Sequence, residues 1–222
     1  VKVGDSLHLV VDAARRNRIR AHHSATHLLH AALKQVLGAH VKQAGSMVAP
    51  DRLRFDFSHY EGIPTDVLAK IEKQVNERIL EGMKVKVEEK SYNEAVKSGA
   101  MALVGEKYGD VVRLVTIGDY SKELCGGTHL SNSAEIGLFA VVSEASIAAG
   151  VRRIEAVTGE GAFNRVQDLK KELVQISETL ECDPKNLPDK INKLHAEHLA
   201  MKKDLEALRK KDLHDRVGTI RA

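Results

Sequence analysis

The sequence predicts an α+β domain over residues 1–160, followed by an α-helical hairpin over residues 161–222. Up to about residue 160, short segments of alternating apolar and polar residues are separated by a few amphipathic helices. Beyond that point, apolar residues recur only at the 3-4 spacing of helices. We therefore expect an antiparallel or mixed sheet with flanking helices, and then a purely helical segment.

Strand and helix patterns follow one another in the first half of the chain. Residues 1–19 alternate around a Gly-Asp turn, which predicts strands belonging to the end of a preceding β element over residues 1–20. An apolar stripe predicts a helix over residues 22–37. Residues 52–58 alternate again and predict a half-buried strand, and the spacing over residues 64–82 predicts a second helix.

The remainder of the first domain is expected to be mostly strands. Residues 84–88 alternate, and Ser91 with Glu94 forms the capping-box pattern of a short helix. Three further strands, separated by glycines, are predicted over residues 111–117, 138–142 and 151–157.

The last sixty residues predict two helices joined by a turn that contains proline. A 3-4-3-4 apolar pattern runs to Leu180, is interrupted between Glu181 and Pro188, and resumes from Ile191. An intramolecular antiparallel hairpin is the economical interpretation, because the stripe is short and has His198 at a core position. A coiled coil that makes the full-length protein a homo-oligomer is the alternative.

Composition and charge exclude several classes of protein. The chain has 222 residues, 43% of them hydrophobic, with 34 Lys and Arg against 31 Asp and Glu, so it is neither disordered nor strongly basic. Its two cysteines, Cys125 and Cys182, indicate a reducing, cytoplasmic location rather than a disulfide framework. It contains no run of 18 apolar residues that could span a membrane. Since it begins at Val1 without a signal-peptide pattern, we expect a segment of a longer protein.

Two short motifs, about a hundred residues apart, together predict a metal site. In HSATH, His23 and His27 are four residues apart, so a helix presents both imidazoles on one face. In CGGTH, two glycines let Cys125 and His129 turn towards the same point. One thiolate and three imidazoles suit Zn²⁺.

Other interpretations of this constellation stay open at the level of the residues. Ser24 occupies the position at which the HExxH motif has its general-base Glu, which disfavours a metalloprotease. Four protein ligands would also suit a purely structural zinc, since catalysis would require a ligand to leave or the coordination to expand. His30, one turn beyond His27, could contact the site or be an ordinary buried histidine.

The ordered set HSATH, CGGTH and GVRRIEAVTG resembles the editing domain of alanyl-tRNA synthetases and, through it, free-standing alanyl-tRNA editing proteins. Further matching stretches are HHSATHLLHAALKQVLGAHVKQAGS, LRFDFSH, GAMALVGEKYGDVVRLV and GDYSKELCGGTH. The resemblance implies an editing-type fold with zinc bound by His23, His27, Cys125 and His129. It also implies hydrolysis of Ser or Gly wrongly esterified to tRNA(Ala), with Gln43 in the editing pocket.

The same resemblance implies the context of the chain. The tail over residues 161–222 is similar to the linker that follows the editing domain. Domains that recognise tRNA(Ala) and ligate alanine to it with ATP are expected before Val1, and a C-terminal domain after Ala222. The threonyl-type editing domain is the nearest alternative, but it has Cys-x-Gly-Pro-His where this chain has Gly-Gly-Thr before His129. A free-standing editing protein would not be expected to carry the tail.

Editing of this kind has a physical rationale. A site that accepts alanine cannot exclude glycine by size, and it rejects the extra hydroxyl of serine only about 10–200-fold. A second, hydrolytic site removes the error, and zinc could there activate water or polarise the ester carbonyl. Thr26 and Gln43 are candidates for contacting the serine hydroxyl or a water, although a helical Thr26 could instead bond to its own preceding turn.

Candidate RNA contacts lie in two arginine clusters. Arg18 and Arg20 belong to the run RRNRIR before the metal helix, and Arg152 and Arg153 follow Gly150. Both pairs could bind phosphates of the tRNA acceptor end, or could be solvated surface charges. A tRNA-binding module with a purely structural zinc and no activity is the second hypothesis for function.

Overall fold

The computed structural model of the chain describes residues 2–102 and 107–220, so part of the GAMALVGEK stretch lies outside the described residues. The chain divides into two compact units, residues 1–165 and residues 166–222, and each is described by itself. Unit 1 combines antiparallel sheets with flanking helices, which confirms the predicted α+β class. Unit 1 contains the predicted metal ligands.

Unit 1 contains a four-stranded sheet in which every neighbouring pair is antiparallel. Its order along the sheet is β1 (Gln43–Val48), β2 (Leu53–Ser58), β7 (Val151–Thr158) and β6 (Phe139–Ala148). The alternation in residues 52–58 places Leu53, Phe55 and Phe57 in the core, where all three are fully buried. The predicted strands at 52–58, 138–142 and 151–157 are therefore confirmed, with β6 longer than expected.

A second, three-stranded antiparallel sheet carries the cysteine motif at its end. Its strands are β3 (Val85–Ser91), β4 (Val111–Ile117) and β5 (Ser121–Leu124), in that order. The short helix α3 (Tyr92–Lys97) begins with the predicted capping box of Ser91 and Glu94. The CGGTH loop follows β5 directly and leads into the 3-10 helix η1 (Ser133–Ile136).

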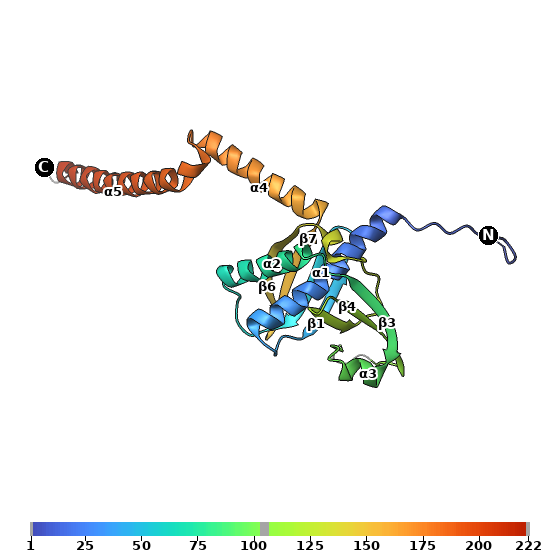
Figure 1. Cartoon of the computed structure of the whole chain (residues 1–222). Coiled ribbons are helices and arrows are strands. Elements are labelled where there is room, and N and C mark those ends of the chain that lie inside the picture. The colour runs from blue at the N-terminus through green and yellow to red at the C-terminus, as the bar shows by residue number, and fades with distance from the viewer. Residues whose placement is uncertain (1, 103–106, 221–222) are drawn as a thin grey trace. The chain divides into compact units, whose positions relative to one another are not determined.

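Helix α1 (Ala13–Leu37) connects the two sheets, because it contacts β1, β2 and β7 of the first sheet and β5 of the second. Helix α2 (Thr65–Leu80) packs beside α1 and contacts β6, as Figure 1 shows. The predicted apolar face of α1 supplies core side chains, among them the fully buried Leu28, Leu29 and Leu33. The core of unit 1 thus fixes the axis of the helix that carries His23 and His27.

The predicted strands over residues 1–19 are wrong. Residues 2–12 form no strand, and α1 begins at Ala13, nine residues before the predicted start at 22. Asp12 caps the helix by accepting a hydrogen bond from the Arg15 N–H. The alternating Val3, Leu7 and Leu9 are exposed. An alternating pattern becomes a strand only where a neighbouring strand pairs with it, and the described chain supplies none to this segment.

Two strands escape prediction from the sequence. β1 reads QAGSMV and β5 reads SKEL, and both contain residues with low strand propensity. Pairing with β2 and β4 respectively, rather than local preference, makes them strands.

Helix α4 (Glu160–Thr179) runs from unit 1 into unit 2, and α5 (Leu187–Ile220) follows the 3-10 turn η2 (Pro184–Asn186). The two helices and the proline-containing break are confirmed, but the antiparallel hairpin is not. Within the described residues α4 and α5 do not pack along each other. Their apolar stripes are exposed, as at Leu173 and Leu205, so burial that would close a hairpin is lacking. No described helix has the combination of length and apolar character needed to cross a membrane.

Candidate metal centre

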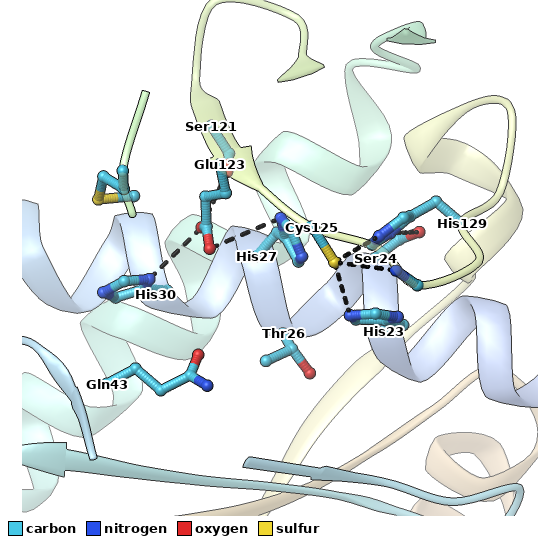
Figure 2. Close-up of polar contacts among 12 residues, drawn as sticks. His23, Ser24, Thr26, His27, His30, Gln43, Ser121, Glu123, Cys125 and His129 are labelled. Carbon is cyan, nitrogen blue, oxygen red and sulfur yellow. Dashed lines mark hydrogen bonds and ion pairs between the residues drawn. The ribbon is translucent and has the colours of Figure 1, made fainter. Parts of the chain in front are cut away.

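The structure brings the four predicted metal ligands together at one point of unit 1. His23 and His27 lie one turn apart on α1, and Cys125 and His129 come from the loop after β5. One ligand atom of each residue lies within 4.8 Å of all the others. Figure 2 shows the Cys125 sulfur facing the imidazoles of His23 and His129 beside the middle of α1.

The shortest distances match those of a tetrahedral zinc site. The Cys125 Sγ lies 3.4 Å from His23 Nε2 and 3.4 Å from His129 Nε2. A tetrahedral zinc with Zn–S and Zn–N bonds of about 2.3 and 2.0 Å separates those ligand atoms by about 3.5 Å. The Gly127 N–H also points at the sulfur at 3.4 Å, and a backbone donor there favours the thiolate that binds metal. The donor set therefore fits zinc in its chemistry, and the sulfur fits it in its spacing to two of the imidazoles.

Burial keeps the imidazoles of the centre in the neutral form that binds metal. Burial first, and then the neighbouring His27, lowers the pKa of His23 to about 4. Burial, His27 and His23 lower the pKa of His129 to about 2. Burial also lowers the pKa of His27. Lone pairs on all three rings are therefore available at neutral pH without prior deprotonation.

Gly127 is required for the close approach of the loop to the helix. A Cβ built at Gly127 would lie 2.0 Å from His23 Cε1, well inside contact distance, whereas a Cβ at Gly126 would meet nothing within 4 Å. The two glycines of CGGTH thus differ in role. Gly127 makes room for the His23 ring, and Gly126 stands in open space.

Ser24 joins α1 to the loop, in the position that the HExxH motif gives to Glu. Its fully buried hydroxyl oxygen accepts a hydrogen bond from the Leu130 N–H at 3.1 Å and lies 3.3 Å from His129 Nδ1. With Nε2 of His129 facing the sulfur, its Nδ1–H is placed to donate to Ser24. Ser24 therefore links α1 to the loop that carries His129, a role that differs from that of the general-base Glu of HExxH.

Two arginines hold the carbonyl groups of the loop. Arg113, in the middle of β4, donates to the carbonyl oxygens of Cys125 and Gly127, and its own carbonyl accepts from the Cys125 N–H. Arg20 of α1 donates from Nε to the His129 carbonyl at 2.5 Å. Arg20, a predicted RNA contact, thus has a partner inside the protein.

Glu123 is the residue at this centre that the sequence motifs did not reveal. It lies in β5, two residues before Cys125, and is only 6% exposed. Its two carboxylate oxygens face His27 Nδ1 at 3.7 Å and His30 Nδ1 at 3.4 Å. Burial opposes its ionisation, but these two imidazoles and Ser121 outweigh burial and keep the pKa of Glu123 below its ordinary value.

The two residues predicted for substrate contact lie on different elements, Thr26 on α1 and Gln43 on β1. The Thr26 hydroxyl donates to the His22 carbonyl at 2.8 Å, which is the bond to the preceding helical turn that the sequence allowed as an alternative. Gln43 is on β1, and its amide donates to the Ser46 hydroxyl at 3.2 Å. Together with His30, Gln43 lines a cavity of about 150 Å³. Both residues appear in Figure 2, and their substrate contacts stay predictions.

The remaining arginines predicted to bind RNA differ in their surroundings. Arg152 donates to the Glu144 carboxylate at 2.7 Å. Arg153 makes a bidentate pair with Asp56 at 2.7 and 2.8 Å. Arg18 is exposed and borders a cavity of about 670 Å³. Within the described residues, Arg152 and Arg153 are thus neutralised by neighbouring strands, and RNA contacts of these arginines stay predictions.

Comparison with known proteins finds similarity to aminoacyl-tRNA synthetases. Residues 112–155 match the family described as the threonyl and alanyl tRNA synthetase second additional domain. An alanine–tRNA ligase of Alkaliphilus oremlandii is 47% identical over 220 residues, covering 99% of this chain and 25% of the relative. Ligases of Halorhodospira halophila and Listeria monocytogenes are 50% and 51% identical, each covering 94% of this chain and 24% of the relative.

The chain is homologous to alanine–tRNA ligases. It spans about a quarter of the length of these relatives, and the predicted resemblance is confirmed. The match of residues 112–155 contains Cys125 and His129 but not the helix with His23 and His27. The 220-residue match to the Alkaliphilus ligase is long enough to include all four.

Proposed function

We propose that the chain is the editing part of an alanine–tRNA ligase and hydrolyses Ser or Gly wrongly esterified to tRNA(Ala). The single observation that carries this proposal is the convergence of one thiol and three neutral imidazoles within 4.8 Å. The similarity to alanine–tRNA ligases over nearly the whole chain supports the substrate class. The partners of the chain would be the acceptor end of tRNA(Ala) and the other domains of the ligase. The chain would act in the cytoplasm.

The residues of the chain have distinct parts in this proposal. His23, His27, Cys125 and His129 hold zinc, which when bound lowers the pKa of a water or polarises the ester carbonyl. Gln43 and His30, which lies one helical turn beyond His27, line a small cavity that in this proposal receives the esterified amino acid. The cavity, at about 150 Å³, is below the size of pockets that enclose larger ligands, which agrees with a substrate as small as Ser or Gly.

A second candidate is a tRNA-binding module in which zinc is only structural. The observation in its favour is the number of protein ligands, because four ligands complete a tetrahedron and leave no position for water. The two candidates differ in what loss of one ligand does to the fold and to hydrolysis.

Deacylation of seryl-tRNA(Ala) by the Cys125→Ala variant separates the two candidates. We expect the wild type to hydrolyse the Ser ester and spare the Ala ester. The variant should fold and lose about 100-fold or more of the rate, since a missing ligand releases the metal. Cys182→Ala, which removes the other cysteine in the turn between α4 and α5, is the matched control and should keep the wild-type rate.

Two results would count against editing. A wild type with no hydrolysis above the spontaneous rate would favour the binding module. An unfolded Cys125→Ala variant, together with an inactive zinc-loaded wild type, would identify a structural zinc.

A further inference from the structure

We propose that Glu123 is a positioning residue for His27, whose carboxylate holds the imidazole with Nδ1–H towards β5 and Nε2 towards the metal. This inference rests on the metal site of the proposed function. It concerns a residue that belongs neither to HSATH nor to the ligands of CGGTH. The inference is based on the geometry of two side chains, Glu123 on β5 and His27 on α1.

The contact between Glu123 and His27 is buried on both sides. Oε2 of Glu123 lies 3.7 Å from His27 Nδ1, and the two side chains are 8% and 5% exposed. Figure 2 shows the carboxylate on one side of the His27 ring and the Cys125 sulfur on the other. A carboxylate buried among protein atoms requires donors, and His27 Nδ1 has no hydrogen-bond partner among the described residues at normal length. A slightly shorter distance would make this contact a hydrogen bond.

The chemistry of a neutral imidazole then decides which nitrogen is the ligand. One ring nitrogen carries the proton and the other a lone pair. If the proton is on Nδ1, facing Glu123, then Nε2 holds the lone pair and faces the other ligands. Histidines that bind metal commonly donate their second N–H to a carboxylate in this way, which orients the ring and raises its basicity.

Two further contacts keep the carboxylate itself in place. The Ser121 hydroxyl donates to Oε1 of Glu123 at 3.2 Å, and His30 Nδ1 lies 3.4 Å from the same oxygen. These contacts engage Oε1, so Oε2 is left for His27. This arrangement explains why a glutamate suits this position better than an amide. All three neighbours, the Ser121 hydroxyl and the Nδ1 atoms of His30 and His27, can donate a hydrogen bond to it.

The direct test is zinc affinity of the full chain with Glu123→Gln, measured by competition with a chromogenic chelator. The amide keeps the shape but replaces one acceptor oxygen by a donor, so we expect zinc to bind about 10–100-fold more weakly. Asp56→Asn is the matched control. Asp56 is also a buried carboxylate in a strand, but it pairs with Arg153 and should leave the zinc affinity unchanged.

Nitrogen-15 NMR of the histidines of the zinc-loaded wild type provides a measurement that does not depend on a variant's folding. The proposal predicts that His27 carries its proton on Nδ1 and binds zinc through Nε2. Binding through Nδ1, or wild-type affinity in a folded Glu123→Gln variant, would overturn the role of Glu123 alone. Failure of the wild type to bind zinc would overturn the metal site and the proposed function with it.

Discussion

At the scale of single residues, the centre depends on a glycine without a side chain as much as on the side chains of the four converging residues. His23 occupies the space next to Gly127 in which any Cβ would stand. The motif CGGTH predicts that its glycines permit a tight turn, but not that only one of them faces a ligand. The difference depends on how the loop packs against the helix with His23. These two segments are about a hundred residues apart in the sequence, so the motif alone does not reveal it.

Gly127→Ala is therefore expected to abolish zinc binding, because the methyl group displaces the His23 ring from the Cys125 sulfur. Gly126→Ala, whose methyl group meets nothing within 4 Å, should bind zinc like the wild type. Isothermal titration of the metal-free variants with zinc measures both. Equal affinities for the two variants would show that the loop stands away from α1.

Residue types and spacing were sufficient to predict which four residues converge, whereas the residues that contact them were not predictable. His23 and His27 follow from helical periodicity, and Cys125 and His129 from a short motif. Ser24, Arg113 and Glu123 act through contacts between segments far apart in the sequence, and no local pattern marks such contacts. The same holds for the carboxylate partners of Arg152 and Arg153.

At the scale of elements, the site is a junction between α1 and the loop that follows β5. Ser24 makes this junction with a single buried hydroxyl, which accepts from the Leu130 N–H and faces His129. The position of the loop relative to the helix therefore depends on a hydrogen bond between elements as well as on the metal.

Ser24→Ala should lower the free energy of unfolding by about 1–3 kcal/mol, because it leaves the buried Leu130 N–H without an acceptor. Urea denaturation of the metal-free variant measures this loss. Ser143→Ala, at an exposed position of β6, should change stability by less than about 0.5 kcal/mol. Equal stability of the two variants would contradict a stabilising junction at Ser24.

Elements with a strong period were predicted well, and elements made by pairing were not. β2, β4, β7 and α2 follow the patterns in their own residues, because each buries one regular face. Residues 2–12 alternate without a partner strand and form none. The hairpin expected from the apolar stripes of α4 and α5 is not formed, for a related reason. An apolar stripe predicts a helix with an apolar face, but it does not predict which element packs on that face.

At the scale of the whole molecule, unit 1 contains the complete centre, with His27 and His129 buried and His23 and Cys125 half-buried, and unit 2 contributes none of the four residues. The buried, neutral histidines of unit 1 link its stability to pH. In the unfolded chain each histidine titrates near 6.5, whereas in the folded, metal-free chain the pKa is lowered to about 4 for His23 and about 2 for His129.

The metal-free protein should consequently lose stability as pH falls below 6.5. Between that pH and the folded values of about 4 and about 2, the unfolded state binds protons that the folded state does not. Thermal melts from pH 7.5 to 4 should show a steadily falling melting temperature. In a variant with both His23 and His129 replaced by Gln, the fall should be smaller, and an unchanged slope would contradict the neutral, buried state of these rings.

The central claim is that this centre is a zinc-dependent hydrolytic site for a mischarged alanine tRNA. Its most direct test is the rate of seryl-tRNA(Ala) hydrolysis by zinc-loaded and by metal-stripped protein, with alanyl-tRNA(Ala) as the control ester. The account predicts rapid loss of the Ser ester with zinc, a rate near the spontaneous one after stripping, and survival of the Ala ester in both. Equal rates for the folded protein with and without zinc would contradict it.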